Sequence, residues 1–180
     1  DFCLSRGLGD VYKRQVMRGE ETQIAGALAL QAVDDLGLIG LPGTHSKWAR
    51  VADGRVVAFD TYMTGEVYAA LSQHTLLART LERGGAFDEA AFRRGLETAQ
   101  SEAGRRGPLS TIFSTRTLGL TGVLTAKAQA DYLSGLLIGH EVQSVCRTLG
   151  AELQGQAWQL IGDEQPVSYT HLTLPTIYSV

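Results

Sequence analysis

The chain has 180 residues, of which 44% are hydrophobic and 19% charged, a composition that excludes a disordered protein. Its net charge of −3 gives no reason to expect general affinity for nucleic acid or for a membrane surface. Two cysteines cannot form a disulfide framework and suit a reducing cytoplasm, and no apolar run approaches the length of a membrane span. We therefore predict a cytoplasmic globular protein.

The two ends differ from the rest of the chain. Residues 1–15 begin with Asp rather than Met and show no sustained hydrophobic period, and residues 166–180 are rich in Thr and Ser and poor in charge. Both resemble translated sequencing adapters at the edges of assembled fragments, although two irregular tails would look similar. We predict that both are non-native tails and that residues 16–165 form the folded unit.

The first predicted element is a helix across residues 16–35, with Glu20 and Glu21 in its first turn. Acidic side chains there favour the positive end of the helix dipole. The short apolar run at residues 38–41 then predicts a buried strand. The pair Asp53–Gly54, between two β-rich runs, predicts a tight hairpin.

Several helices are expected next. Residues 64–81 have one apolar face and predict a helix capped by Thr64, on which His74 is expected to be an ordinary half-buried histidine. Asp88 lies between two phenylalanines at the spacing of a hydrophobic staple, which predicts another helix start. A short apolar segment at residues 109–113 is also expected to be helical.

The last part of the folded unit combines one long helix with a strand. Residues 125–149 predict the helix, and Gly135 and Gly139 within it would let a neighbouring element approach closely. Residues 157–161 predict a strand. A helix, a strand with a hairpin, several helices and a final strand together indicate an α/β fold.

Residues 42–47 have the composition of a phosphate-holding loop. They offer a glycine that lets backbone N–H groups approach a ligand, two hydroxyl groups and two side chains that can be positively charged. These residues are Gly43, Thr44, His45, Ser46 and Lys47. A plain hairpin connection can have the same composition, so this pattern alone leaves the question open.

The carboxylates at the start of the first helix admit two interpretations. Glu20 and Glu21 can be surface charges that complement the helix dipole, or one of them can accept a proton from a hydroxyl nucleophile near the loop. Phosphoryl transfer needs phosphate donors, a positioned base and positive charge close together. The sequence contains no zinc-type Cys/His cluster, no Gly-x-Ser-x-Gly elbow and no Gly-x-x-x-x-Gly-Lys-Ser/Thr loop.

Four segments carry a family resemblance in order along the chain. They read Val-Met-Arg-Gly-Glu-Glu-Thr-Gln, Leu-Pro-Gly-Thr-His-Ser-Lys-Trp, Tyr-Met-Thr-Gly-Glu and Leu-Ser-Gly-Leu-Leu-Ile-Gly-His-Glu. From about residue 16 to residue 165 the chain resembles the 2-dehydro-3-deoxygalactonokinase family. The resemblance implies an α/β actin-like (ribonuclease H-like) ATPase fold of two domains that close on ATP and Mg²⁺. It also implies phosphorylation of 2-dehydro-3-deoxy-D-galactonate at the 6-hydroxyl, in galactonate degradation.

The chain also departs from this family. Such kinases begin with a strand and a phosphate loop of the Asp-Trp-Gly-Ser-Thr-Asn kind, which is not found here. The adenosine-binding segment would begin at residues 160–162, where the second tail follows closely. The resemblance therefore implies most of the C-terminal domain of a two-domain sugar kinase, and we expect this chain to be inactive by itself.

The resemblance also suggests roles for individual residues. Gly43, Thr44, His45 and Ser46 would form the second phosphate loop. Glu21 is the preferred general base and Glu20 the reserve. Arg18 and Arg116, and with less support Lys47, would bind the carboxylate of the sugar acid, because guanidinium groups pair with carboxylates in a bidentate manner. No metal ligand is assigned.

The expected partners are the sugar acid and ATP, without nucleic acid or membrane, and homo-oligomer formation is left open. A different class of function is also compatible with the sequence, namely a non-catalytic module on an actin-like domain that senses a sugar or a nucleotide.

Overall fold

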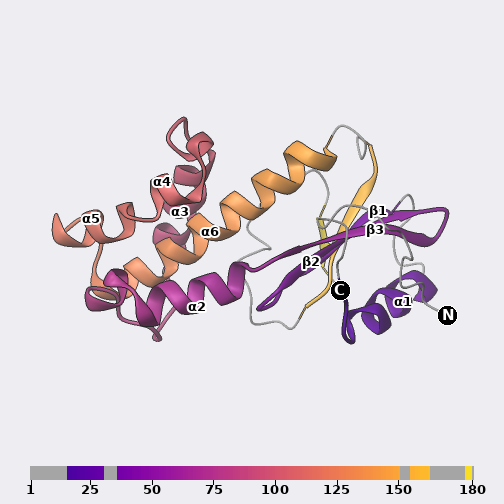
Figure 1. Ribbon diagram of the computed structural model, residues 1–180, viewed down its shortest axis with the longest axis horizontal. Coiled ribbons are helices and arrows are strands. Elements are labelled where there is room, and N and C mark those ends of the chain that lie inside the picture. The colour runs from indigo at the N-terminus through magenta and orange to yellow at the C-terminus, as the bar shows by residue number, and fades with distance from the viewer. Residues whose placement is uncertain (1–15, 31–35, 151–154, 163–176, 180) are drawn as a thin grey trace.

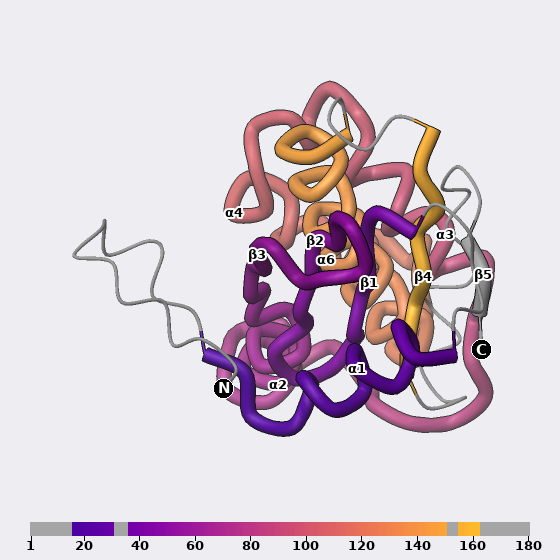
Figure 2. Tube along the Cα trace, turned by 90° about the vertical axis from the view of Figure 1, so that its right-hand side faces the viewer, coloured from indigo at the N-terminus to yellow at the C-terminus, as the bar shows by residue number. Residues whose placement is uncertain are grey.

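The centre of the fold is a mixed sheet with the strand order β3-β2-β1-β4-β5 (Figure 2). The computed structural model describes residues 16–30, 36–150, 155–162 and 177–179. In it, β1 pairs with β2 and β2 with β3 in antiparallel fashion, whereas β1 pairs with β4 and β4 with β5 in parallel. The strands are β1 (Leu36–Leu41), β2 (Ser46–Ala52), β3 (Arg55–Tyr62), β4 (Ala157–Leu160) and β5 (Ile177–Ser179).

Helices cover both faces of this sheet, which confirms the predicted α/β class. In Figure 2, α1 (Glu20–Leu30) lies in front of the strands and α6 (Ala126–Leu149) behind them. Figure 1 shows that the remaining helices extend beyond one end of the sheet. They are α2 (Thr64–His74), α3 (Glu89–Gln100), α4 (Pro108–Thr111), α5 (Ser114–Leu120) and the short 3₁₀ turns η2 (Leu76–Arg79) and η3 (Gly104–Arg106).

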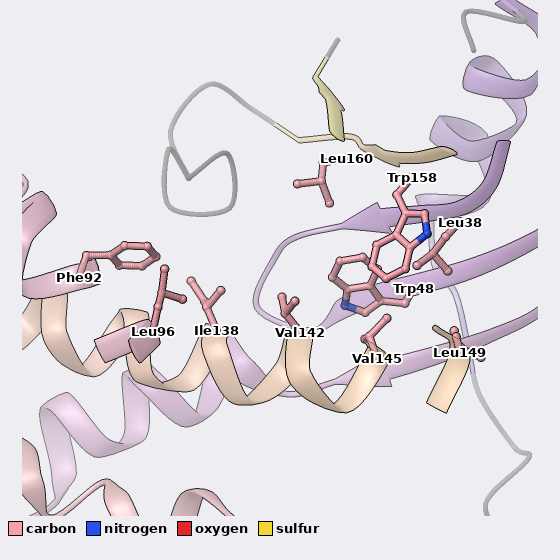
Figure 3. Close-up of a cluster of buried hydrophobic side chains, with 10 residues drawn as sticks. All are labelled: Leu38, Trp48, Phe92, Leu96, Ile138, Val142, Val145, Leu149, Trp158 and Leu160. Atoms are coloured by element: carbon pink, nitrogen blue, oxygen red, sulfur yellow. The ribbon is translucent and has the colours of Figure 1, made fainter. Parts of the chain in front are cut away.

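The alternation of side chains along β1 and β2 divides the core between the two faces. Leu38 and Trp48 are buried in the cluster between the sheet and α6, where Val145 of α6 faces them (Figure 3). Ile39 and Ala49, one position further along their strands, are buried in the cluster beneath α1. Both strands are therefore covered on both sides, which explains the nearly continuous apolar run of β1.

The helices α3 and α6 approach each other through glycines. A Cβ atom on Gly135 would lie 2.1 Å from the carbonyl oxygen of Phe92, and one on Gly95 would lie 2.2 Å from the carbonyl oxygen of Tyr132. A Cβ atom on Gly139 would come within 2.7 Å of a side chain of α3. The predicted close approach at Gly135 and Gly139 is therefore confirmed, and α3 is the neighbour.

Two buried polar residues connect α6 to other elements. The carboxylate of Glu141, which is 3% exposed, accepts a hydrogen bond of 2.7 Å from Nε1–H of Trp48. His140 shares a hydrogen bond of 2.9 Å with the hydroxyl of Thr111 in α4. Burial lowers the pKa of His140, and the charge of Arg147 lowers it further, so the neutral imidazole is favoured. This part of the fourth family-like segment therefore holds α6 against β2 and α4.

The predicted hairpin and helix starts are largely confirmed. Asp53 and Gly54 both have positive φ, 50° and 68°, as a tight primed hairpin turn requires. The carboxylate of Asp88 accepts the N–H of Ala91 at 3.0 Å and so caps α3. Thr125 caps α6 in the same way.

The helix predicted across residues 64–81 is wrong in three respects. α2 ends at His74, because Thr75 adopts an extended conformation and its hydroxyl accepts the N–H of Leu77 in η2. Met63 rather than Thr64 is the N-cap residue, and no side chain caps this helix. His74 is exposed rather than half-buried, because its place at the end of α2 lies outside the packed part of the helix.

Parts of the predicted organisation lie outside the described residues. These are the first tail (1–15), the end of the first predicted helix (31–35) and most of the second tail (166–176 and 180). Residues 177–179, which the sequence analysis assigned to that tail, form β5 beside β4.

Candidate phosphate-binding site

The predicted phosphate loop is the connection from β1 to β2. Residues 42–45 follow directly after the buried strand β1. Gly43 and Thr44 are exposed, and no hydrogen bond among the described residues uses their N–H groups. A Cβ atom on Gly43 would meet nothing within 4 Å. The backbone of the loop is therefore open to an incoming ligand, as a phosphate loop requires.

Lys47 does not extend into the solvent around this loop. Its side chain is 6% exposed, and alternation along β2 places it with Ala49 on the face that α1 covers. There its Nζ lies 4.0 Å from Oε1 of Glu20. The lysine therefore connects the strand after the loop to the first turn of α1.

The first turn of α1 presents two carboxylates at its start. Oε2 of Glu20 accepts the N–H of Arg18 at 2.6 Å, and Oε2 of Glu21 accepts the N–H of Gly19 at 2.7 Å. Burial raises the pKa of Glu20, but the backbone hydrogen bonds and the charges of Lys47 and Arg18 outweigh it, so this pKa lies below its usual value. Glu20 is therefore ionised at neutral pH.

The first turn of α2 packs against the loop. The N–H of Glu66 donates to the carbonyl oxygen of Thr44 at 3.0 Å, and the carboxylate of Glu66 contacts Nε2 of His45. A Cβ atom on Gly65 would lie 2.7 Å from the carbonyl oxygen of Gly43. Hydrogen bonding and close backbone packing thus join α2 to the loop.

The sequence analysis placed Glu66 in the first turn of a helix and assigned it no role in this site, although a signal for such a role exists. The hairpin predicted at Asp53–Gly54 pairs Ser46 with Tyr62 across β2 and β3. That register returns the chain to the loop just before the segment Thr-Gly-Glu begins at residue 64.

The structure does not bring every predicted site residue to the loop. Arg116 lies in α5, at the opposite end of the molecule from α1 (Figure 1), and its guanidinium donates to the carbonyl oxygen of Leu76 at 3.3 Å. Arg18 is exposed beside the first turn of α1. Ser46 is 1% exposed, and its hydroxyl donates to the carbonyl oxygen of Gly43 at 3.5 Å.

Other features of the described residues do not extend this site. They contain no group of three or more His, Cys, Asp or Glu side chains that could hold a metal ion. No helix in the described ranges combines the length and the apolar composition that a membrane crossing requires. A shallow depression shares no residue with the loop and is lined by α3 alone, namely by Glu89, Ala90, Arg93, Arg94 and Glu97.

The fold and the site together define an α/β protein with an open glycine loop between two acidic helix starts. The family pattern described as 2-keto-3-deoxy-galactonokinase matches residues 6–172. The chain therefore belongs to the 2-keto-3-deoxy-galactonokinase family. This match confirms the resemblance inferred from the four sequence segments.

Individual relatives agree with this assignment. A probable 2-dehydro-3-deoxygalactonokinase from Rhizobium meliloti (strain 1021) is 42% identical over 147 residues, which are 79% of this chain and 47% of the relative. The 2-dehydro-3-deoxygalactonokinase of Escherichia coli (strain K12) is 38% identical over 133 residues, 72% of this chain and 42% of the relative. The chain thus spans about half the length of the curated relatives that it matches.

A solved structure shows the same fold. The crystal structure of a candidate 2-dehydro-3-deoxygalactonokinase from Sinorhizobium meliloti superimposes with a TM-score of 0.78 at 30% sequence identity. The superposition covers 95% of this chain and 57% of the solved chain.

Proposed function

We propose that the protein containing this segment is an ATP-dependent kinase that phosphorylates 2-dehydro-3-deoxy-D-galactonate at its 6-hydroxyl, in galactonate degradation. Family membership supports the class of reaction. The observation that carries the proposal for this segment is the position of Glu20, whose carboxylate meets Lys47 4.0 Å away beside an open phosphate loop. A carboxylate, a cation and free backbone donors thus gather at one end of β1.

The proposed fold of the whole protein is the actin-like ATPase fold, with two α/β domains that close on ATP. The mixed sheet with helices on both faces supports this assignment for the present segment. This chain covers 57% of the solved chain that it resembles. A second domain in the whole protein is compatible with that coverage.

In the proposed reaction, the exposed loop residues Gly43, Thr44 and His45 bind the phosphates of ATP, whereas Ser46 is buried and its hydroxyl supports the loop through Gly43. The oxygen of the sugar 6-hydroxyl attacks the γ-phosphorus, the bond from that phosphorus to the bridging oxygen of ADP breaks, and the hydroxyl proton passes to a carboxylate. The transition state of such transfers is loose and the proton leaves late. An ionised carboxylate therefore acts mainly by orienting the hydroxyl.

Both Glu21 and Glu20 remain candidates for this carboxylate. The sequence analysis preferred Glu21. The geometry adds an argument for Glu20, because its second oxygen faces the buried Lys47, whereas the one described contact of Glu21 is with the N–H of Gly19. On this arrangement Lys47 positions Glu20 and does not bind substrate. Arg18 is then the candidate in this segment for the carboxylate of the sugar acid.

Mg²⁺ is proposed to accompany the nucleotide. The described residues hold no grouping of three or more typical ligands, and Mg²⁺ commonly uses one or two carboxylates together with substrate phosphates. When bound, the ion would neutralise charge on the phosphates. No ligand in this segment is assigned to it.

The test is kinase activity of the full-length protein with Glu20→Gln, Glu21→Gln and both changes together. We expect the variant of the true base to lose about 100-fold or more in kcat, while Glu102→Gln, an exposed carboxylate on the loop after α3, keeps wild-type activity. A wild-type protein that phosphorylates a different sugar, but not the keto-deoxy acid, would overturn the substrate assignment. A wild-type protein that binds the sugar acid without turnover would favour a sensing module instead.

The 180-residue chain itself is expected to show no turnover. The described residues supply one phosphate loop, and in-line transfer requires the nucleotide and the hydroxyl to be held in one geometry. Measurable phosphorylation by the purified chain would refute this expectation.

A further inference from the structure

The segment Tyr-Met-Thr-Gly-Glu at residues 62–66 has no part in the reaction described above, yet it packs directly against the predicted phosphate loop. Three contacts join them. The N–H of Glu66 donates to the carbonyl oxygen of Thr44 at 3.0 Å, the carboxylate of Glu66 contacts Nε2 of His45, and Gly65 lies against the backbone of Gly43.

Gly65 is required for the other two contacts. A Cβ atom there would lie 2.7 Å from the carbonyl oxygen of Gly43 and 2.7 Å from Cα of Thr44. Both are backbone atoms, so a larger side chain cannot be accommodated by a change of rotamer. Any other residue at this position would displace either the loop or the first turn of α2.

The contact with Glu66 determines which edge of His45 is available to a ligand. Nε2 faces the carboxylate, and a ring N–H in that position donates a hydrogen bond to the carboxylate. When the ring is protonated, Nδ1–H remains as the donor for another acceptor. Both side chains are about half exposed, at 49% and 50%, so the pair lies at the surface where a ligand would approach the loop.

We infer that Gly65 and Glu66 are positioning residues of the phosphate loop, which hold its backbone and orient His45 towards the phosphates of a nucleotide. The inference rests on the proposed function for the identity of the ligand. Glu66 acts through His45, so its effect on nucleotide affinity depends on the presence of that imidazole. Gly65 acts by allowing α2 to approach the loop.

The first test uses the ligand-free chain, so that it does not depend on kinase activity. The imidazole ¹⁵N and ¹H signals of His45 are compared by NMR between wild type, Glu66→Gln and the matched control Glu102→Gln. We expect the His45 signals to shift in Glu66→Gln and to stay in place in the control. Unchanged signals in Glu66→Gln would overturn the assigned contact.

The second test measures ATP affinity of the full-length protein by calorimetry, with and without His45. We expect Glu66→Ala to weaken ATP binding about 10-fold, a change equivalent to one hydrogen bond to a charged group. In a His45→Ala background the same change should have little further effect, because the two residues act as one unit. Equal losses in both backgrounds would refute a role through His45.

Two further variants separate positioning from general damage. Glu66→Gln keeps an acceptor for Nε2–H and should retain more ATP affinity than Glu66→Ala. Gly65→Ala should weaken ATP binding at least as much as Glu66→Ala. An unchanged affinity in Gly65→Ala would contradict the inference. Failure of the wild-type protein to phosphorylate the sugar acid, with these ATP effects intact, would overturn the proposed substrate and leave the positioning role standing.

Discussion

The glycine contact between α3 and α6 yields the sharpest stability prediction. In Gly135→Ala, the new Cβ atom would overlap the carbonyl oxygen of Phe92, which lies 2.1 Å from its ideal position. The next two atoms, at 2.9 and 3.1 Å, also belong to the backbone of Phe92. The helices must therefore move apart, because no side chain can rotate to make room.

The expected magnitude combines two opposing effects. Overpacking of a closely packed core costs about 1–3 kcal/mol, and a rigid backbone neighbour favours the upper end of that range. Replacement of glycine by alanine within a helix stabilises the fold by about 1 kcal/mol, because alanine has the higher helix propensity. The net loss is then about 2 kcal/mol, which corresponds to a fall in Tm of roughly 4–8 °C for a chain of this size.

Thermal unfolding followed by circular dichroism measures this change, and Gly26→Ala is the matched control. Gly26 lies in α1, where a Cβ atom would meet nothing within 4 Å. There only the propensity term applies, so Gly26→Ala should raise stability by about 0.5–1 kcal/mol. A Gly135→Ala variant that is as stable as the wild type, together with a stabilised Gly26→Ala, would refute the packing argument.

Three further predictions concern buried or half-buried polar groups. Trp48→Phe removes the N–H that Glu141 accepts at 2.7 Å, so urea titration should show a loss of about 1.5–3 kcal/mol, and an unchanged midpoint would contradict this. The folded chain has a lowered pKa at His140, so its stability should fall as pH decreases below about 6.5; Tm of His140→Asn should fall less over this range, and parallel curves would count against the prediction. Burial and the nearby charge of Asp88 raise the pKa of Asp131, although the Asp131 carboxylate accepts the N–H of Asp88. Asp131→Asn should therefore keep or increase the Tm at pH 7, and a clear decrease would show that the charge of Asp131 is needed.

Local chemistry explains which parts of the fold were predictable from sequence. The Asp53–Gly54 turn and the Asp88 cap depend on residues within a few positions of one another, and both were predicted correctly. The helix at residues 64–81 was predicted too long, because an apolar face continues past Thr75 while the hydroxyl of that residue starts a new turn. The hydrophobic periodicity of the sequence does not reveal a break of this kind.

The sequence identified candidate residues for the site, but it did not predict how most of them contact one another. The loop residues at 42–47 and the acidic start of α1 were both identified. The direction of Lys47 depends on which face of β2 is covered by α1, and that is a property of the tertiary fold. The contact of His45 with Glu66 joins residues 21 positions apart and becomes visible only through the register of the hairpin between them.

The geometry also changes how the charges of the loop are understood. Counted along the sequence, His45 and Lys47 make the loop positively charged. In the structure each faces a carboxylate, Lys47 that of Glu20 on α1 and His45 that of Glu66 on α2. If the loop binds phosphate as proposed, the attraction therefore depends mainly on the open N–H groups of its backbone and on the orientation of one imidazole edge. Hydrogen bonds depend strongly on direction, whereas the attraction due to net charge does not. Because carboxylates of two helix starts face the cations of the loop, we expect ATP binding to depend mainly on the geometry of the loop. Changes at Gly65 should therefore weaken ATP binding more than the loss of a surface charge would.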